Sequence, residues 1–319
     1  MKNNLLGSTG IKVSEISFGT VSLGLPYGIG SGSEKDPPDE KSAISLLHLA
    51  KDKEINFYDT AAVYGTSEAI IGKAFRECRE KVIICTKPDH VYEDLNTRRL
   101  PSDKQITDRL ELSLTQSLKK LNTDYIDVYM SHDGGEDIIG NDTVISFFSK
   151  QKRAGKIRAT GISVYSVEES NKAVESGVWD VIQLPFNLLD QSHLPAIRFA
   201  AEKGIGIVVR SVLCKGVLTD KGSTLHPALR GVQEHRLKYS SLFHAHAETL
   251  PQLAVKFALS TAGISSVLVG IDKPAYLTEA LSVIDGNPLS EKYLQEAEKL
   301  AYPDSSFINL LHWGKMGWL

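Results

Sequence analysis

Short apolar runs alternate with segments of helical apolar spacing along nearly the whole chain. A short apolar run between polar turns is typical of a buried strand, and apolar residues three and four positions apart are typical of an amphipathic helix. Ala43, Leu46, Leu47 and Ala50 show the helical spacing. Strands are predicted at 16–20, 56–58, 82–87, 125–132, 159–164, 181–185, 205–211 and 266–271, and helices at 40–53, from Glu68 onward, and at 106–121, 144–153, 167–176, 194–203, 250–259 and 275–283.

Eight strands, each followed by a helix, predict a closed parallel (β/α)8 barrel. We expect residues 1–319 to form this single domain, since no linker or low-complexity segment interrupts the alternation. A short hairpin is predicted at 5–13, before the first barrel strand. A helix at 291–300 and the tail to Leu319 are extra to the barrel.

A doubly wound parallel sheet is the alternative architecture. Such a sheet usually opens with a G-x-G-x-x-G turn directly after its first strand. The candidate here, GIGSGS at 28–33, lies well past the first strand in a Gly- and Pro-rich loop at 21–38. The barrel is therefore the preferred prediction, with a second long polar insertion at 212–247.

Composition and charge exclude several classes of protein. The 319 residues carry a net charge of −3, which gives no sign of a nucleic-acid partner or of an anionic membrane surface. The stretch MKNNLLGSTGIKVSE lacks the long apolar region of a signal peptide, and the apolar run 264–271 is too short to span a bilayer. Cys78, Cys85 and Cys214 are scattered and odd in number, which predicts reduced thiols in a cytoplasmic protein.

Polar side chains stand at the ends of three successive predicted strands. Asp59 ends the second strand and leads to Tyr64, Lys87 ends the third, and His132 ends the fourth. Neighbouring barrel strands end at one rim, so these side chains are expected to converge. A buried lysine needs a partner, for which Asp59 is the natural candidate. Lys87 is expected to lower the pKa of Tyr64 from about 10 toward working pH, which would make the phenol a general acid or base.

The motifs around these residues resemble those of the aldo-keto reductase family. They are FYDTAAVYG with SEAIIGKAF, ICTKP, DVYMSHD, GISVYS, VIQLPFN and VRSVLCKGVL, and they span nearly the whole chain in the family's order. The resemblance implies a barrel with a nicotinamide cofactor at its carboxyl rim. It also implies that hydride passes between nicotinamide and a carbonyl carbon, in either direction. The catalytic set that it assigns is Asp59, Tyr64, Lys87 and His132.

The resemblance also assigns cofactor contacts. Ser163 and Gln183 would hold the carboxamide, although Val164 replaces the family's asparagine. Arg210 stands where many members stack a tyrosine on the nicotinamide, and a planar guanidinium can stack likewise; a rim salt bridge is the alternative. Further contacts are assigned to Gly19, Thr20 and Asp59, and to Ser211, Leu213 and Gly216 in the loop that passes the pyrophosphate.

The segment for the adenosine end, VLVGIDKPAYLTEAL, departs from the family pattern. Gly270 takes the place of the usual basic residue, and Tyr276 that of the usual arginine. Ala280 replaces the asparagine beside Glu279, so Lys273 is the one basic residue that remains. A 2′-phosphate favours positive charge and bidentate donors. The family implies NADP, and these changes keep NAD as the alternative, with Gly270, Lys273 and Glu279 as the assigned contacts.

The expected substrate is a small carbonyl compound or alcohol. The loop at 133–141 is short and acidic, which predicts an open, polar pocket, and the RSV of the seventh strand resembles family members that act on sugars. One alternative is an NAD-dependent aldose or polyol dehydrogenase that runs oxidatively. Another is a cofactor-sensing subunit without turnover, similar to potassium-channel β subunits, which the intact catalytic set disfavours. The oligomeric state stays open.

Two further segments invite a functional interpretation. The insertion at 212–247 is expected to fold over the cofactor, and its histidines lack a carboxylate or cysteine at ligand spacing, so no metal site is predicted. The tail is expected to line the substrate pocket, to cap the barrel or to meet another subunit. The residues concerned are His226, His235, His244 and His246 in the insertion, and Phe307, Leu310, Leu311, Trp313 and Trp318 in the tail.

Overall fold

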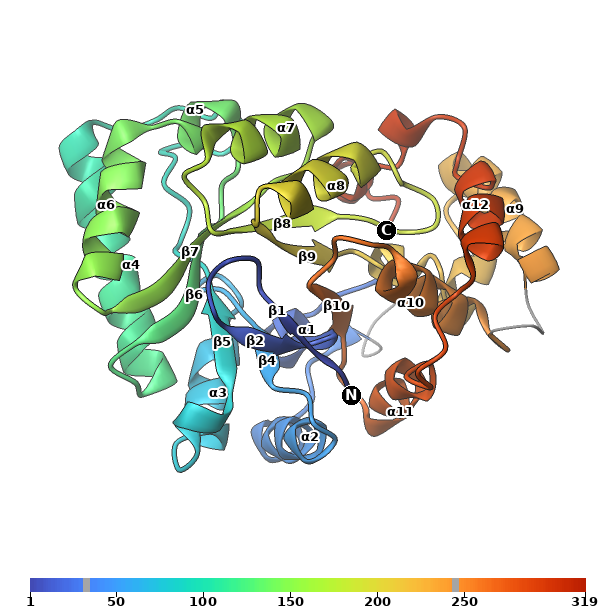
Figure 1. Cartoon of the computed structure of the whole chain (residues 1–319), viewed down its shortest axis with the longest axis horizontal. Helices are drawn as coiled ribbons and strands as arrows, with labels where there is room; N and C mark the ends of the chain where they lie inside the picture. Colours follow the sequence, from blue (N-terminus) through green and yellow to red (C-terminus); the bar gives the residue numbers. More distant parts are fainter. Residues whose placement is uncertain (31–34, 243–246) are drawn as a thin grey trace.

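Eight parallel strands close into a barrel in the computed structural model, which describes residues 1–30, 35–242 and 247–319 (Figure 1). The strands are β3 (Ile16–Gly19), β4 (Phe57–Asp59), β5 (Ile83–Thr86), β6 (Ile126–Ser131), β7 (Ile157–Ser163), β8 (Val181–Pro185), β9 (Gly206–Arg210) and β10 (Ser266–Gly270). They pair in chain order, and β10 pairs with β3 to close the circle. The predicted (β/α)8 barrel is therefore confirmed.

The barrel strands are largely apolar because both of their faces are covered. β3 and β6 are buried at every position, as expected of parallel strands with helices outside and packed side chains inside. All eight predicted strands are present. Their ends differ slightly from the predicted ones, since strand ends are the least well determined part of an apolar pattern.

Helices follow the strands in turn and surround the barrel. The longer ones are α2 (Glu40–Asp52), α3 (Ser67–Ala74), α4 (Asp103–Leu121), α6 (Asp142–Arg153), α7 (Val167–Ser176), α8 (Leu194–Glu202), α10 (Leu250–Ser260), α11 (Pro274–Ser282) and α12 (Glu291–Lys299). α7 illustrates how these helices begin and end. The Ser166 hydroxyl accepts from the Glu169 N–H, and the Glu169 carboxylate accepts from the Ser166 N–H. Gly177 then ends the helix at a left-handed φ of 63°.

The amino-terminal hairpin closes one end of the barrel. β1 (Asn3–Leu5) and β2 (Lys12–Ser14) pair antiparallel, as predicted. Between and within them, Leu6, Ile11 and Val13 are buried, and they cluster with barrel residues such as Val128 and Val208. A ligand site is therefore left to the opposite end, where the strands finish.

Four short helices lie in segments that the sequence pattern assigns to loops or tail. They are α1 (Val21–Gly24), α5 (Glu136–Ile139), α9 (Arg230–His235) and α13 (Leu310–Lys315). Such short helices complete too little of the 3.6-residue repeat to be visible as apolar spacing. A 3-10 helix (Arg236–Leu242) continues from α9, so the insertion is largely helical in its described part.

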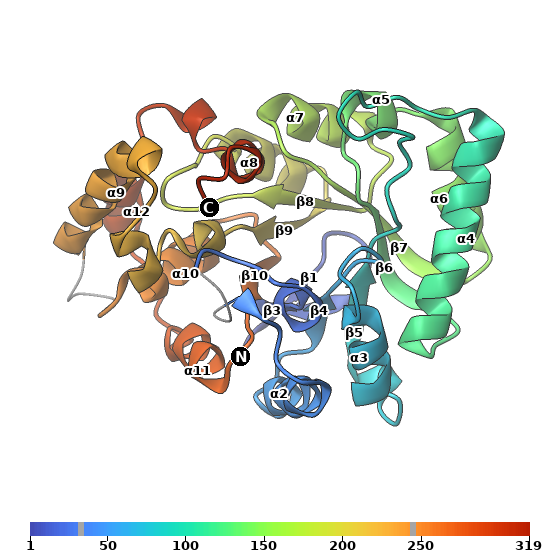
Figure 2. The ribbon, with the colours of Figure 1, turned by 180° about the vertical axis from the view of Figure 1, so that it is seen from behind.

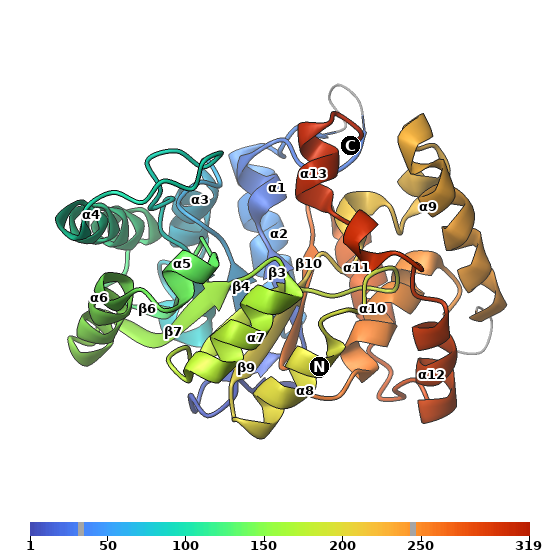
Figure 3. The same cartoon turned by 90° about the horizontal axis from the view of Figure 1, so that it is seen from above.

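The insertion and the tail are held against the body of the protein. The buried Tyr239 hydroxyl lies 2.6 Å from the Leu188 carbonyl oxygen and 2.7 Å from that of Leu300, which joins the insertion to the end of α12. Trp313 is fully buried with its ring centroid 5.8 Å from that of Phe307. Figures 2 and 3 show α9 beside α12 at one edge of the barrel, with α4 and α6 at the other edge.

Candidate active site

A cavity of about 890 Å³ opens where the barrel strands end. Its volume lies in the upper part of the range of about 300–1,000 Å³ that is typical of small-molecule and cofactor sites. All of the site residues assigned from the sequence except Lys273 line this cavity. Those that line the cavity are Gly19, Thr20, Asp59, Tyr64, Lys87, His132, Ser163, Gln183, Arg210, Ser211, Leu213, Gly216, Gly270 and Glu279.

Lys87 and Asp59 form a buried ion pair in the cavity wall. Lys87 Nζ donates to Asp59 Oδ1 at 2.7 Å and to the Thr60 carbonyl oxygen at 3.1 Å. Gln183 Nε2 donates to the same Asp59 oxygen at 2.8 Å. Burial by itself lowers the pKa of Lys87, but Asp59, Tyr64 and Cys85 together outweigh burial and raise that pKa above its usual value. Lys87 is therefore charged at any physiological pH, with the partner that the sequence predicted.

Tyr64 lies beside this ion pair, in the loop between β4 and α3. Lys87 Nζ is 5.6 Å from the centroid of its ring. Burial raises the pKa of Tyr64; Lys87 lowers it, and Asp59 raises it again. The expectation that Lys87 brings this pKa down toward neutrality is therefore wrong for the net shift, because Asp59 offsets the lysine charge and the phenol is desolvated. At neutral pH the phenol is protonated, which suits it to donate a proton.

His132 completes the group at the end of β6. Its ring meets that of Tyr64 edge-on, with centroids 6.0 Å apart and planes at 84°. Burial lowers the pKa of His132 well below its usual range, and the Lys87 charge lowers it further. A neutral imidazole keeps one N–H that can donate to a carbonyl oxygen. The structure thus brings all four side chains of the predicted catalytic set together.

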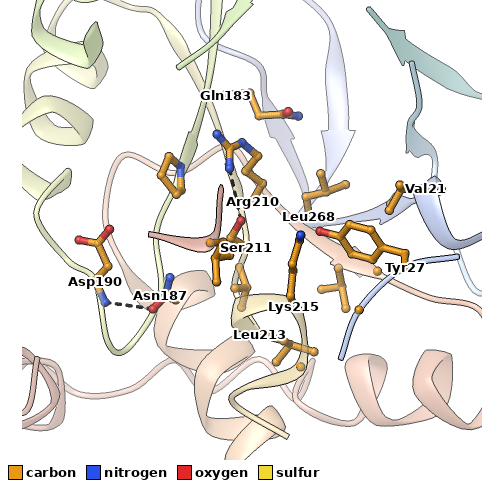
Figure 4. A pocket seen from close by; sticks show the side chains of 18 of the residues that line it. Val21, Tyr27, Gln183, Asn187, Asp190, Arg210, Ser211, Leu213, Lys215 and Leu268 are labelled. Atoms are coloured by element: carbon orange, nitrogen blue, oxygen red, sulfur yellow. Dashed lines mark hydrogen bonds between the residues drawn. The ribbon is translucent and has the colours of Figure 1, made fainter. Parts of the chain in front are cut away.

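Arg210, at the end of β9, is held by neutral groups. Its Nη2 donates to the Val164 carbonyl oxygen at 2.8 Å, and its Nη1 donates to the Ser211 hydroxyl at 3.3 Å. Its guanidinium lies 4.3 Å from the centroid of the Tyr165 ring. These contacts differ from the rim salt bridge that was the alternative prediction. Figure 4 shows Arg210 with Gln183 and Ser211 at the wall of the cavity.

The loop after β9 has an unusual backbone. Ser211, Cys214, Lys215 and Gly216 adopt left-handed φ angles of 60°, 46°, 56° and 109°. For residues other than glycine this region costs on the order of 1–3 kcal/mol each, and such strain gathers at ligand clamps. The Ile29 N–H donates to the Lys215 carbonyl oxygen at 3.1 Å, so the strained loop is tied to the loop that follows α1.

Tyr27 and Lys215 are cavity-lining residues that the sequence reasoning missed. Lys215 Nζ lies 5.4 Å from the centroid of the Tyr27 ring, and Figure 4 shows the two side chains facing each other. The position of Lys215 inside the loop assigned to the pyrophosphate could have marked it as a cofactor contact. No sequence feature marks Tyr27 as a lining residue, because the path of its Gly- and Pro-rich loop depends on the fold. Other polar lining residues that were not assigned from the sequence are Asn187, Asp190 and His193 after β8, and Ser305, Ser306 and Asn309 in the tail.

The far end of the cavity, next to α11, is acidic. Asp272 and Glu279 line it together with Tyr276, and Glu279 Oε1 accepts from the Thr249 hydroxyl at 3.1 Å. Lys273 is exposed, and its ammonium lies 5.9 Å from the centroid of the Tyr276 ring. The basic residue assigned to the adenosine end is therefore outside the cavity lining, which holds two carboxylates there.

The histidines of the insertion have other roles or fall outside the described residues. His226 Nδ1 accepts from the Ala228 N–H at 3.2 Å, and His235 Nε2 lies 2.8 Å from the Leu300 carbonyl oxygen. His244 and His246 lie outside the described residues. Within the described ranges, no group of three or more His, Cys, Asp or Glu is arranged to hold a metal ion. No helix of those ranges has the length and apolar character needed to cross a bilayer.

Comparison with known proteins gives consistent matches over the whole barrel. The model of the Aldo/keto reductase family matches residues 15–301. Aldo-keto reductase YhdN of Bacillus subtilis (strain 168) is 31% identical, over 92% of this chain and 91% of its own length. L-galactose dehydrogenase of Arabidopsis thaliana is 28% identical over 93% of both chains. The NADH-specific methylglyoxal reductase of Escherichia coli (strain K12) is 27% identical, over 90% of this chain and 94% of its own.

A solved structure extends the similarity to three dimensions. Aldo-keto reductase AKR11C1 from Bacillus halodurans, in its holo form, superposes with a TM-score of 0.77 at 25% sequence identity. The superposition covers 96% of this chain and 97% of that one. The likeness therefore includes the barrel and most of the segments added to it.

Proposed function

The chain belongs to the aldo/keto reductase family of oxidoreductases, and on that premise we propose that it interconverts a carbonyl compound and its alcohol with Tyr64 as general acid and base. The observation that carries this proposal is the position of Tyr64 in the cavity wall. It lies beside the Lys87–Asp59 ion pair and edge-on to His132, so a ligand in the cavity can meet a proton donor and a hydrogen-bond donor together.

The polar groups of the cavity fit a nicotinamide dinucleotide, which supplies or accepts hydride when bound. Ser163 and Gln183 offer a hydroxyl and an amide to a carboxamide. The loop at 211–216, with four left-handed residues, offers close backbone approach and the Lys215 ammonium to a pyrophosphate. A β-carbon at Gly270 would point into open space, so the glycine leaves room beside the end of β10. We keep Gly19, Thr20, Asp59, Arg210, Ser211, Leu213 and Gly216 as assigned contacts.

Each of the four side chains has its own role in the proton transfer. In the reductive direction, Tyr64 donates its proton to the substrate oxygen as that oxygen becomes negative. His132 donates a hydrogen bond to the same oxygen and orients the carbonyl. Lys87 stabilises the phenolate that remains, and Asp59 holds Lys87 in place. In the oxidative direction the phenolate is the base, so one arrangement serves both directions.

The pH dependence of reduction follows from the sign of the Tyr64 shift. Burial raises the pKa of Tyr64 above its usual value of about 10, so the proton-donating form persists through neutral and alkaline pH. We expect kcat/KM for carbonyl reduction to stay level from about pH 7 to about pH 10 and to fall only above it. NADH oxidation followed by absorbance, with circular dichroism at each pH as the control for folding, checks this. A falling limb centred near neutral pH would contradict it.

For the cofactor, we propose that NAD(H) is preferred over NADP(H). A 2′-phosphate carries about two negative charges, which the carboxylates of Asp272 and Glu279 disfavour, whereas a ribose 2′-hydroxyl can donate to them. Lys273 is not part of the lining. One similar chain, the Escherichia coli methylglyoxal reductase, carries NADH specificity in its name.

Asp272→Ser is expected to tighten NADPH binding about tenfold and to leave NADH binding within about twofold. The change removes one of the carboxylates that a 2′-phosphate would face, and a serine hydroxyl can donate to that phosphate. Quenching of protein fluorescence gives both dissociation constants. Asp108→Ser, an exposed position on α4 away from the cavity, is the matched control. A wild-type protein that already binds NADPH more tightly than NADH would contradict the proposal.

As the substrate class, we propose polyhydroxylated, sugar-like carbonyl compounds and their alcohols. Ser22, Tyr27, Tyr165 and Asn309 line the same cavity as Tyr64, and their hydroxyl and amide groups match the hydrogen bonds of a polyol. L-galactose dehydrogenase, a similar chain, has a sugar in its name. The test compares kcat/KM for aldoses and polyols with NAD⁺ against kcat/KM for simple aldehydes and ketones with NADH. A kcat/KM that is higher for simple alkyl carbonyls than for every sugar would overturn it.

Fluorescence titration with NADH and NADPH is the most direct test of the proposed function. Binding of either cofactor, followed by turnover of a carbonyl or alcohol, supports it, and binding of neither overturns it. The free thiols of Cys78, Cys85 and Cys214 support the cytoplasm as the compartment of this activity.

A further inference from the structure

A second histidine, His90, stacks on His132. The two ring centroids are 4.8 Å apart and the ring planes are 16° from parallel. His90 stands in the loop after β5, the strand that leads to Lys87, whereas His132 follows β6. Since Tyr64 meets the His132 ring edge-on, the position of that ring is defined by contacts from two other loops.

Asp133 anchors His90. His90 Nδ1 and Asp133 Oδ1 are 2.6 Å apart, and Asp133 Oδ2 accepts from the Val91 N–H at 2.9 Å. Asp133 is buried, and both of its carboxylate oxygens are engaged. The Ser131 hydroxyl donates to the Asp133 carbonyl oxygen at 2.9 Å. This carboxylate therefore ties the loop after β5 to the end of β6, next to the catalytic histidine.

We propose that the His90–Asp133 pair is a positioning unit, which holds the His132 ring in the orientation needed to hydrogen-bond the substrate's carbonyl oxygen. The inference rests on the proposed function, because it presumes that role for His132. Neither His90 nor Asp133 is part of the cavity lining. Their effect on the reaction must therefore pass through His132 rather than through contact with substrate or cofactor.

The stack has an electrostatic consequence. The hydrogen bond to Asp133 raises the pKa of His90, so this ring carries positive charge to higher pH than a free histidine does. Burial lowers the pKa of His132, and the charges of Lys87 and His90 lower it further. A cation stacked on its face thus helps to keep His132 neutral. The charged or titratable groups that face the pair are Lys87, Arg210 and Tyr64 around His132, and Asp89 and Asp133 around His90.

One substitution in each residue of the pair tests the proposed positioning unit. His90→Phe keeps a stacking ring and removes the charge and the hydrogen bond; Asp133→Asn keeps the shape of the anchor and removes its charge. The first readout is the chemical shift of the His132 imidazole C2 proton as a function of pH, in NMR spectra of the protein alone. This resonance is assigned because it is missing from the spectrum of His132→Gln. We expect its titration midpoint to rise by about one pH unit in both variants, because each weakens the cation on the ring.

The second readout is kinetic. With 4-nitrobenzaldehyde and NADH as probe, we expect kcat to fall about tenfold in both variants while the dissociation constant for NADH stays unchanged. His48→Phe is the matched control, since His48 lies against Phe75 away from the cavity. Thermal unfolding followed by circular dichroism verifies that each variant is folded.

The outcomes separate this inference from the proposed function. If His132→Gln is inactive while both variants match the wild type in kcat and in the His132 titration, the positioning unit is wrong and the role of His132 stands. If His132→Gln keeps the wild-type rate, the proposed role of His132 fails and the inference fails with it. A raised midpoint together with a lowered kcat supports the unit.

Discussion

Tyr64→Phe is expected to lower kcat for carbonyl reduction about 10³-fold, within the range of about 10²–10⁴ that general acid–base catalysis contributes. The change removes one oxygen atom. The ring contacts with His132, at 6.0 Å between centroids, and with Lys87, at 5.6 Å, can persist because they involve the ring. Binding of NADH is expected to stay within about twofold of the wild type. Initial rates and fluorescence titration on the same preparation give both quantities.

Tyr165→Phe is the matched control for this prediction. Tyr165 also lines the cavity, but its ring packs under the Arg210 guanidinium rather than beside Lys87. We expect this variant to keep kcat within about tenfold of the wild type, since it leaves the proton donor in place. If Tyr64→Phe retained the wild-type rate, or if both variants lost activity equally, Tyr64 would not be the general acid.

Lys87→Met is expected to abolish activity and to reduce the free energy of unfolding by about 3–5 kcal/mol. Asp59 and Lys87 are 2% and 1% exposed, so the substitution leaves a carboxylate buried without its cation. Gln183 still donates to Asp59, but one neutral hydrogen bond does not replace an ion pair. Urea denaturation, fitted with a common m-value, measures the loss of stability.

The double variant Asp59→Asn/Lys87→Met separates the structural effect from the catalytic one. It removes both charges, and an asparagine oxygen can still accept from Gln183. We therefore expect it to recover most of the lost stability while staying inactive, because the ammonium beside Tyr64 that stabilises its phenolate is gone. A single Lys87→Met variant as stable as the wild type would show that the ion pair adds nothing to folding. A double variant with normal turnover would refute the assigned role of Lys87.

The fold could be predicted because the spacing of apolar residues in each helix or strand indicates which of its positions are buried. A parallel strand covered on both faces is largely apolar, and eight such runs alternating with helical patterns leave few architectures. The pattern did not predict α1, α5, α9 and α13, since each is too short to repeat. Contacts with distant segments hold them in place; in α9, for example, His235 Nε2 lies 2.8 Å from the Leu300 carbonyl oxygen.

The sequence by itself determined the barrel and the convergence of Asp59, Tyr64, Lys87 and His132, because neighbouring parallel strands must end at the same rim. The tertiary structure alone decided the rest of the site. It left Lys273 outside the cavity lining, brought Tyr27 to Lys215, and stacked His90 on His132. It also reversed the expected net pKa shift of Tyr64. Loop paths and desolvation depend on all the surrounding elements at once, and neither is recorded in the local spacing of residues.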